Sequence, residues 1–391
     1  MDIRIEHARL SGSIAAIPSK SYAQRILTAC ALADQPTEVL LNVDSEDVRS
    51  ANQSLISLGV ELKTEKNSVI VSPIKPISFP NINCGESGTM ARFLLPITAA
   101  LYDNGVISGE GSLLNRPFEI LCDVLERNGC TFISKRLPIS FRGRIKPGNY
   151  EIRGDESSQY ISGLLFALPL LSGNSTITLT TPLESSGYVD MTLHVLKMFG
   201  IEINGKHGVF EIKGRQYYKS PDTVAVEGDW SNAAFWIAAD VEVTGLNPDS
   251  LQKDKLFGVV KGECEIDASE ILDLVPILSV MAAIKNSVTR IYNVKRLRLK
   301  ESDRIKSTVD MLISLGCEAT AYKNEIAISG CGKLRGGTVD GANDHRIVMA
   351  AAIASCFCEK PVIITGAQAV NKTYPDFFED FNRLGGKAVV V

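Results

Sequence analysis

The hydrophobic and polar positions of this chain repeat one pattern, in which an amphipathic helix ends at a glycine and a short strand follows. Five copies place this glycine at Gly59, Gly129, Gly200, Gly316 and Gly385. Glycine at this place supplies the left-handed backbone conformation that ends a helix. Consecutive glycines are 70, 71, 116 and 69 residues apart. Helix–glycine–strand segments are common in α/β proteins, but such near-constant spacing favours a duplicated architecture.

The widest interval indicates a sixth copy. Its midpoint is Gly258, within the segment 255–260, which we interpret as a degraded repeat. Each unit is also predicted to contain a second helix, at residues 21–33, 88–101, 157–171, 230–239, 270–284 and 344–355. Strands such as 69–72 and 326–329 complete a β-α-β-α-β-β unit. The sequence therefore predicts two α/β domains of three units each, and the first strand, 2–10, is a candidate to join the second half.

Composition agrees with a globular protein of two domains. The chain has 391 residues, of which 45% are hydrophobic and 22% charged, and it contains no apolar run long enough to cross a bilayer. Its first residues carry no recognisable targeting signal. Nine cysteines form neither a CxxC pair nor a zinc-type cluster. We therefore expect a cytoplasmic protein with reduced thiols and without a metal site.

The net charge of −4 limits the partners that the protein can have. Nucleic-acid binding requires a basic surface, so this charge argues against it. A site for anions would have to be assembled from lysines and arginines that the fold brings together.

The start of the first helix has groups that suit an anion. Lys20 and Ser21 lie at its N-terminus and Arg25 lies one turn later, so an ammonium, a hydroxyl, backbone N–H groups and a guanidinium come together. The glycines of a Walker A loop are missing. The alternative is an ordinary serine cap with solvated cations.

Similar groups stand near other predicted helix starts: Gly88, Arg116, Ser157, Ser158, Gln159, Ser185, Tyr188, Arg346 and Lys372. Each one taken alone can be a helix cap or a surface residue. Their repetition in an acidic chain predicts a site for multiply charged anions between the two halves of the chain.

The densest charge cluster is Lys300-Glu301-Ser302-Asp303-Arg304, where a predicted strand, 288–294, gives way to a helix, 305–315. Ligands bind at such strand ends, although a solvated charge cluster is the alternative. Asp273 lies in an apolar run, so its carboxylate is expected either to pair with a cation or to have a raised pKa. Both conditions suit a proton carrier. His345 is expected to be structural rather than catalytic.

Together these segments resemble the enolpyruvyl transferases, most closely the branch that acts on shikimate 3-phosphate. The resemblance covers essentially the whole chain. It rests on Pro18-Ser19-Lys20-Ser21 with Arg25, Ser87-Gly88-Thr89, Arg116-Pro117, Ser157-Ser158-Gln159, Lys300 to Arg304, Asp344-His345-Arg346 and Lys372-Thr373-Tyr374-Pro375-Asp376. It implies a two-domain inside-out α/β barrel of six units with the active site in the interdomain cleft. Chain crossings near Ile17 and Glu227-Gly228 would give one domain of residues 1–17 and 228–391 and another of 18–227.

The resemblance also implies a reaction. The enolpyruvyl group of phosphoenolpyruvate would be transferred to the 5-hydroxyl of shikimate 3-phosphate with release of phosphate, by a monomer without a metal or organic cofactor. Shikimate 3-phosphate would be held by Lys20, Ser21, Arg25, Ser157, Ser158, Ser185 and Lys300, with Tyr188 nearby. Phosphoenolpyruvate would be held by Lys20, the Gly88 backbone, Arg116, Gln159, Arg304, Arg346 and Lys372.

Two carboxylates would divide the proton transfers of this reaction. Asp273 would contact the substrate and take the proton from the attacking hydroxyl. Glu301 would protonate the methylene group and later remove that proton. Lys20 and Lys372 are grouped with them as catalytic residues, since clustered cations stabilise developing charge.

Three positions depart from the family pattern. Glu86 stands where Asn is common, Phe93 where many members have Pro, and Arg296 where Asn precedes the Lys-Glu motif. These departures bear on local contacts and on binding of the inhibitor glyphosate more than on the reaction.

Three other functions fit the sequence less well. A sister enzyme type acting on a UDP-amino sugar carries Lys-Asn in the first motif and a cysteine on the loop around 111–116, whereas this chain has Lys20-Ser21 and no cysteine there. An RNA 3′-phosphate cyclase shares the repeat unit but needs a nucleotide-accepting histidine and a basic face, which a pI of about 5.8 and four histidines disfavour. An inactive anion-binding relative is disfavoured because Asp273 and Glu301 are both present.

Overall fold

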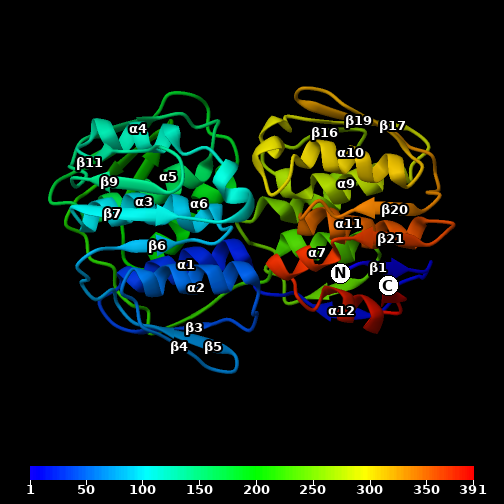
Figure 1. Cartoon of the computed structure of the whole chain (residues 1–391), viewed down its shortest axis with the longest axis horizontal. Coiled ribbons are helices and arrows are strands. Elements are labelled where there is room, and N and C mark those ends of the chain that lie inside the picture. Colours follow the sequence, from blue (N-terminus) through cyan, green and yellow to red (C-terminus); the bar gives the residue numbers. More distant parts are fainter. The chain divides into compact units, whose positions relative to one another are not determined.

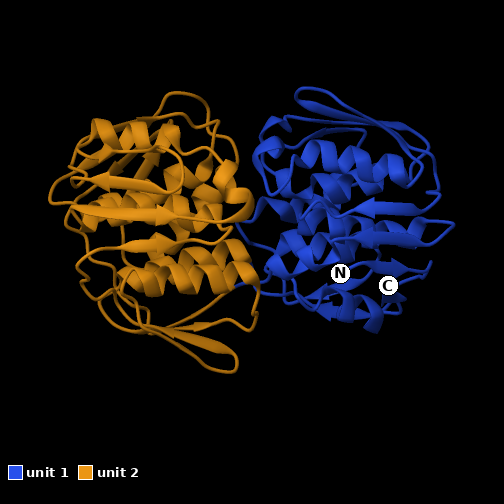
Figure 2. Ribbon diagram, viewed as in Figure 1, with its two compact units in different colours: residues 1–19, 227–391 blue, residues 20–226 orange.

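The computed structural model describes all 391 residues, and the chain forms two compact units. Unit 1 comprises Met1–Ser19 and Glu227–Val391, and unit 2 comprises Lys20–Val226 (Figure 2). Strand β1 (Ile3–Ile5) pairs antiparallel with β21 (Val362–Thr365) and β22 (Ala388–Val390). The prediction that the first strand joins the second half of the chain is therefore confirmed.

Unit 2 contains three four-stranded sheets, in the orders β14-β3-β5-β4, β6-β7-β9-β8 and β10-β11-β13-β12. Their strands are β3 (Thr37–Leu40), β4 (Leu62–Thr64), β5 (Ser68–Val71), β6 (Asn81–Asn83), β7 (Asn104–Ser108), β8 (Thr131–Phe132), β9 (Ile139–Arg142), β10 (Asn149–Ile152), β11 (Ser175–Leu179), β12 (Ile203–Lys206), β13 (Val209–Ile212) and β14 (Thr223–Ala225). In each sheet the first pair is parallel and the other pairs are antiparallel. The predicted β-α-β-α-β-β order is therefore present. In the first unit the edge strand that pairs in parallel is β14, which comes from the C-terminal end of residues 20–226.

Three helices form the interior of unit 2: α1 (Lys20–Leu32), α3 (Gly88–Leu101) and α5 (Ser158–Ala167). Almost every residue of these helices is buried. By contrast α2 (Glu46–Ser57), α4 (Glu119–Arg127) and α6 (Ser186–Met198) bury only part of their residues. Helices inside and sheets outside make this an inside-out arrangement (Figure 1).

Helices α3 and α5 approach closely because α5 has a glycine at the crossing. A Cβ atom at Gly163 would lie only 2.2 Å from the Arg92 carbonyl oxygen and 3.0 Å from Pro96 Cγ. Pro96 has no N–H to donate to the Arg92 carbonyl, as a regular helix would require. The starts of α3 and α5, where predicted site residues lie, are thus held at a fixed separation.

Unit 1 is built in the same way. Its buried helices are α7 (Trp230–Ala238), α9 (Val275–Ala283) and α11 (His345–Ala354), and α10 (Arg304–Ser314) and α12 (Phe377–Arg383) are less buried. Its two four-stranded sheets have the orders β16-β17-β19-β18 and β20-β21-β1-β22. The further strands are β16 (Glu265–Asp267), β17 (Val288–Tyr292), β18 (Glu318–Ala321), β19 (Glu325–Ser329) and β20 (Gly337–Asp340). No helix is both long and apolar enough to cross a bilayer.

The predicted role of the glycines is confirmed in five units and wrong in the sixth. Gly59, Gly129, Gly200, Gly316 and Gly385 all have positive φ, between 75° and 118°. Gly258 instead lies inside the short helix α8 (Phe257–Val260), directly after the 3-10 turn η3 (Lys253–Leu256). This unit retains only the pair β2 (Ser13–Ala15) and β15 (Glu242–Thr244). The sheet of this unit has only two strands where the other units have four, and the segment around Gly258 is helical and is anchored by the buried Phe257.

Candidate functional site

The start of α3 in unit 2 forms a corner suited to an anion. Ser87 caps the helix by accepting from the Met90 N–H at 3.3 Å and also accepts from Gln24 Nε2 of α1 at 3.0 Å. The guanidinium of Arg116 lies over Gly88, since a Cβ there would be 2.9 Å from Arg116 Nη1. The predicted residues Gly88 and Arg116 are therefore brought together at a helix N-terminus, where backbone N–H groups and a cation both favour negative charge.

Arg92 is a residue of this corner to which the sequence analysis gave no role. Its Nη1 donates to Gln159 Oε1 at 2.7 Å and its Nη2 to the Pro117 carbonyl at 3.2 Å. The guanidinium lies between the rings of Phe118 and Tyr160, at 5.3 and 5.1 Å. The signal that could have identified it is its place one turn into the helix that begins at Gly88.

Gln159 links α5 to α3. While its oxygen accepts from Arg92, its Nε2 donates to Thr89 Oγ1 at 2.8 Å. Ser157 caps α5, with its hydroxyl accepting from the Gln159 N–H at 3.3 Å, and Ser158 is buried. The predicted Ser-Ser-Gln motif therefore both caps a helix and faces the corner around Gly88, so the two alternatives for this segment are not exclusive.

Arg25 is fixed more firmly than its place in the sequence indicates. It is 2% exposed and donates to Thr192 Oγ1 at 2.9 Å, to the Ser21 carbonyl at 2.8 Å and to the Tyr188 carbonyl at 3.1 Å. Burial lowers the pKa of its guanidinium to about 10, although the nearby Tyr188 raises it. The structure brings Ser21, Arg25 and Tyr188 together and ties α1 to α6.

Two further features of unit 2 accompany these residues. Lys20 Nζ forms an ion pair with Asp47 of α2 at 3.0 Å, and Asp47 was not identified from the sequence. Ser185, the residue before α6, adopts φ 54° and ψ 48°, which is left-handed backbone. Such a conformation in a residue other than glycine is strained and is often found at ligand sites.

In unit 1, Arg304 is the centre of a buried charge network. It is 1% exposed and contacts three carboxylates: Asp273 through Nη1 at 2.9 Å, Glu301 through Nη2 at 2.5 Å, and Asp344 through Nε at 2.8 Å. Burial disfavours its charge, but the carboxylates, Asp344 foremost, raise the pKa of Arg304 above its usual value. The alternative that residues 300–304 form a solvated cluster is therefore wrong.

Asp273 is surrounded by cations. Lys300 Nζ lies 3.2 Å from its Oδ1, and Arg346 Nη2 lies 3.5 Å from its Oδ2. Burial raises the pKa of Asp273, but Lys300, Arg346 and Arg304 outweigh this effect and hold the pKa well below its usual range. Burial in turn lowers the pKa of Lys300. Asp273 was expected either to pair with a cation or to have a raised pKa, and the structure shows that it pairs with cations.

Asp344 holds the site of unit 1 together. It is fully buried and accepts from Ser302 Oγ at 3.0 Å and from the Arg346 N–H at 3.0 Å in addition to Arg304. The two residues before it, Ala342 and Asn343, both have φ of 51°. This strained loop presents the Asn343 carbonyl to Lys372 Nζ at 3.0 Å. The predicted residues Arg304, Arg346 and Lys372 are thus connected through a loop that sequence analysis did not single out.

The residues that depart from the family pattern have defined places. Glu86 lies beside the loop 111–116, since a Cβ at Gly111 would meet its carboxylate and Ser112 Oγ lies 3.5 Å from it. Phe93 is fully buried, with its ring 5.3 Å from that of Phe166. Arg296 donates from Nη2 to the Ser269 carbonyl at 2.8 Å. His345 is buried at the start of α11.

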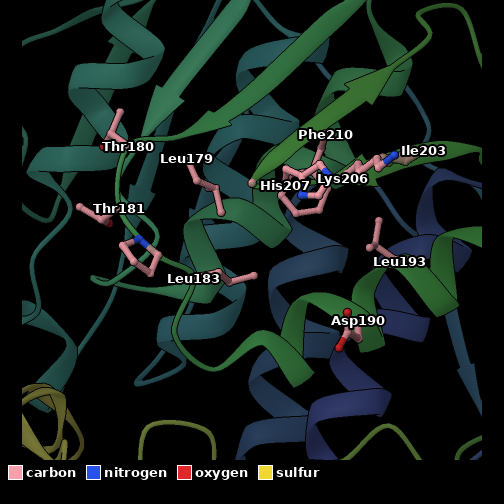
Figure 3. Close-up of a pocket in the computed structure, with 13 residues that line it drawn as sticks. Leu179, Thr180, Thr181, Leu183, Asp190, Leu193, Ile203, Lys206, His207 and Phe210 are labelled. Carbon is pink, nitrogen blue, oxygen red and sulfur yellow. The ribbon is translucent and has the colours of Figure 1, made fainter.

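A large cavity of unit 2 lies apart from these residues. It has a volume of about 740 Å³ and is bordered by the β12–β13 hairpin, with Lys206 and His207, and by Asp190 and Leu193 of α6 (Figure 3). None of the predicted site residues lines it. No group of three or more His, Cys, Asp or Glu side chains could hold a metal ion.

Comparisons with known proteins agree with this geometry. The model of the EPSP synthase (3-phosphoshikimate 1-carboxyvinyltransferase) family matches residues 5–263 and 257–381. Proteins named 3-phosphoshikimate 1-carboxyvinyltransferase from Clostridium novyi and Clostridium acetobutylicum are 38% and 39% identical to the chain, over 98% of it and 98% and 97% of their own lengths. The solved EPSP synthase of Acinetobacter baumannii has a TM-score of 0.82 and 23% identity over 100% of both chains, which confirms the inside-out α/β fold. The chain is therefore a member of the EPSP synthase family.

Proposed function

We propose that the two basic sites act on one pair of substrates and carry out the reaction of this family. Phosphoenolpyruvate donates its enolpyruvyl group to the 5-hydroxyl of shikimate 3-phosphate, and phosphate is released. The observation that carries the proposal is the buried network in which Asp273 and Glu301 share Arg304, with Lys300 and Arg346 beside them. Such a set combines proton carriers with fixed positive charge for anionic reactants.

Asp273 is proposed as the base that takes the hydroxyl proton. In the free protein its surrounding cations hold its pKa well below the usual range, so it is a weak base. Anionic substrates that bind Lys300, Arg304 and Arg346 neutralise part of that positive charge and thereby raise the proton affinity of Asp273. Base strength would then develop only when the substrates are in place.

Glu301 is proposed as the acid that protonates the methylene carbon and as the base that later removes that proton. Its carboxylate is held by Arg304, the first residue of α10, at 2.5 Å, and its side chain retains 17% exposure. The two carboxylates contact different terminal nitrogens of one guanidinium, so a change of charge on either one affects the other. This coupling suits a reaction in which one group gains a proton as the other loses one.

The remaining predicted residues are proposed as binding groups. Gly88, Arg116, Gln159, Arg304, Arg346 and Lys372 would hold phosphoenolpyruvate. Ser21, Arg25, Ser157, Ser158, Ser185, Tyr188 and Lys300 would hold shikimate 3-phosphate, and Lys20 would contact both. Arg92 would position Gln159, since its Nη1 donates to Gln159 Oε1 at 2.7 Å.

The test is an assay of phosphate release from phosphoenolpyruvate. Phosphate should appear with shikimate 3-phosphate as the acceptor and not with UDP-N-acetylglucosamine. Release with the UDP sugar alone would assign the chain to the sister enzyme type. No release with either acceptor, from folded protein, would favour an inactive anion-binding relative.

We also propose that the enzyme acts as a monomer in the cytoplasm. The complete set of predicted binding and catalytic groups comes from a single chain, and all nine cysteines are free thiols. Light scattering behind size-exclusion chromatography should give the mass of one chain, 42.4 kDa. A stable mass of two chains at assay concentration would contradict the monomer.

Replacing Gly88 by Ala should weaken phosphoenolpyruvate binding more than turnover. The added Cβ would lie 2.9 Å from Arg116 Nη1, which is the far end of a flexible side chain, so the guanidinium moves and the fold is retained. We expect KM for phosphoenolpyruvate to rise about tenfold, since loss of one hydrogen bond to a charged group costs about 1.5 kcal/mol of binding free energy. Steady-state kinetics measure this change, and Gly258→Ala, where nothing lies within 4 Å, is the matched control. An unchanged KM would remove Arg116 from the binding set.

Glu86→Asn should increase sensitivity to glyphosate, which occupies the phosphoenolpyruvate site in this family. Glu86 places a carboxylate beside the loop that carries Arg116, and its negative charge should oppose an anionic inhibitor. Inhibition constants for wild type and Glu86→Asn measure the effect. Phe93 is fully buried against Phe166, so Phe93→Pro tests core packing as well as inhibitor binding. Equal inhibition constants for wild type and both variants would contradict a role for these two departures.

A further inference from the structure

One buried carboxylate of unit 1 has no role in the mechanism above. Asp254 lies on the turn η3 and is 6% exposed. The turn is fixed by the neighbouring Gln252, whose Oε1 accepts from the Trp230 N–H at 3.1 Å and whose Nε2 donates to the Gly228 carbonyl at 2.8 Å. Asp254 therefore lies on a turn that is hydrogen-bonded to the start of α7.

The same part of unit 1 contains Arg346. Its Nη1 lies 3.5 Å from the Ser231 carbonyl, one residue beyond the Trp230 N–H that anchors the turn. Its Nη2 lies 3.5 Å from Asp273. The charged groups that face Asp254 are Asp273 from η4 (Leu272–Leu274), Arg346 from α11 and Asp229, the residue that caps α7. Lys300 and Arg346 are paired with Asp273 instead, and Lys372 donates to the Asn343 carbonyl.

Asp254 is one of several carboxylates in this part of unit 1. The others are Asp229, Asp273, Glu301 and Asp344, and the cations among them are Lys300, Arg304 and Arg346, with Arg296 acting on Lys300. An ionised Asp254 would add a fifth negative charge in a buried place. Burial first, and then the charge of Asp273, raise the pKa of Asp254 to about 7, against the opposing effect of Arg346.

We propose that Asp254 takes up a proton when a substrate carboxylate or phosphate binds at Arg346, so that ligand charge replaces the charge of Asp254. The inference rests on the proposed function, because it requires Arg346 to bind phosphoenolpyruvate. An anion on Arg346 withdraws the one nearby positive charge that favours ionised Asp254 and adds a like charge beside it. By linkage, a group that gains a proton on binding makes the affinity for the ligand fall as pH rises through its free-state pKa. Asp254 is thus a positioning residue that sets the charge around Arg346.

The expected pH dependence follows from this fall in ligand affinity with rising pH. Below about pH 7 Asp254 is already neutral and no proton is taken up. At about pH 7 roughly half a proton is taken up per bound ligand, and above it the uptake approaches one. The kcat/KM for phosphoenolpyruvate should then fall by up to about tenfold per pH unit above 7. The phosphate of the ligand also titrates, but its contribution is the same for wild type and variant.

The experiment compares wild type, Asp254→Asn and Asp249→Asn. Asn keeps the shape of Asp254 in its neutral form, and Asp249 is an exposed carboxylate on the same loop. Phosphoenolpyruvate alone is titrated calorimetrically in two buffers of different ionisation enthalpy near pH 7.5, and kcat/KM is measured from about pH 6 to 8.5. The proposal expects Asp254→Asn to lose the proton uptake and to retain near pH 8 the kcat/KM that wild type has near pH 6. Asp249→Asn should behave as wild type.

Different outcomes bear on the role of Asp254 and on the proposed function. Equal proton uptake and parallel pH profiles for wild type and Asp254→Asn would overturn the role of Asp254 and leave the function standing. Failure of wild type to release phosphate from phosphoenolpyruvate with shikimate 3-phosphate at any pH would instead overturn the proposed function. Asp254→Asn should also unfold at a higher temperature than wild type near pH 8, because it removes a carboxylate whose folded-state pKa is raised. If Asp254→Asn does not fold, Asp254→Ser, whose side chain is also neutral, replaces it in the comparison.

Discussion

Asp273→Asn and Glu301→Gln are each expected to lower turnover by about 10²–10⁴-fold, the usual contribution of a general acid or base. Each change removes a proton carrier and leaves Lys300, Arg304 and Arg346 in place, so substrates should still bind. Turnover is measured by phosphate release, and binding of shikimate 3-phosphate by calorimetry. Asp310→Asn, an exposed carboxylate of α10 that pairs with Lys306, is the matched control and should keep wild-type turnover.

Stability has to be measured beside turnover for Asp273→Asn. The surrounding cations hold the pKa of Asp273 well below its usual value, so its charge stabilises the fold at neutral pH. That contribution is lost only as pH falls through the lowered pKa of the folded state, and the variant lacks it throughout. A folded Asp273→Asn that binds shikimate 3-phosphate but turns over slowly supports its role as the base. Near-native turnover of either variant would show that the proton is carried by another group.

Asp344→Ala is expected to destabilise unit 1 by about 3–5 kcal/mol, the cost of removing one partner from a buried ion pair. Asp344 is fully buried and Arg304 is 1% exposed, so the guanidinium would keep its charge without its main counter-ion. Asp344 also accepts from Ser302 Oγ and the Arg346 N–H, so three segments would lose a common acceptor. Urea unfolding followed by circular dichroism measures the loss.

The matched variant for Asp344→Ala is Asp344→Asn. The amide keeps one acceptor oxygen and the shape of the side chain, so the loss of stability should be smaller than for Ala while Arg304 is less well held. Asp340→Asn, at the exposed end of β20, should change stability little. A loss below about 1 kcal/mol for Asp344→Ala would mean that Asp273 and Glu301 suffice to hold Arg304.

The architecture was largely predictable because its signals are local. Glycine readily adopts the positive φ that ends many helices, and at five of the predicted positions it does. The prediction failed at Gly258 because spacing alone located it, and Gly258 lies inside a short helix of a unit whose sheet has only two strands. The membership of the first strand in unit 1 depended on pairing with strands more than 350 residues away, which the sequence could only suggest.

In the candidate site, too, groups that are neighbours in the sequence were predictable and contacts between distant residues were not. The helix starts with Lys20, Gly88, Ser157 and Arg346 were visible because capping groups and cations stand next to each other in the sequence. The sequence also determined the family, through motifs that each lie within a few consecutive residues. Only the tertiary structure decided which charges neutralise which, because Arg304 meets Asp273 and Asp344 across separations of 31 and 40 residues. The balance between burial and neighbouring charges then decides the sign of each pKa shift. Cations outweigh burial and lower the pKa of Asp273, whereas burial raises the pKa of Asp254 to about 7. Electrostatic energy depends on distance and on exclusion of water, and neither quantity exists before the chain is packed.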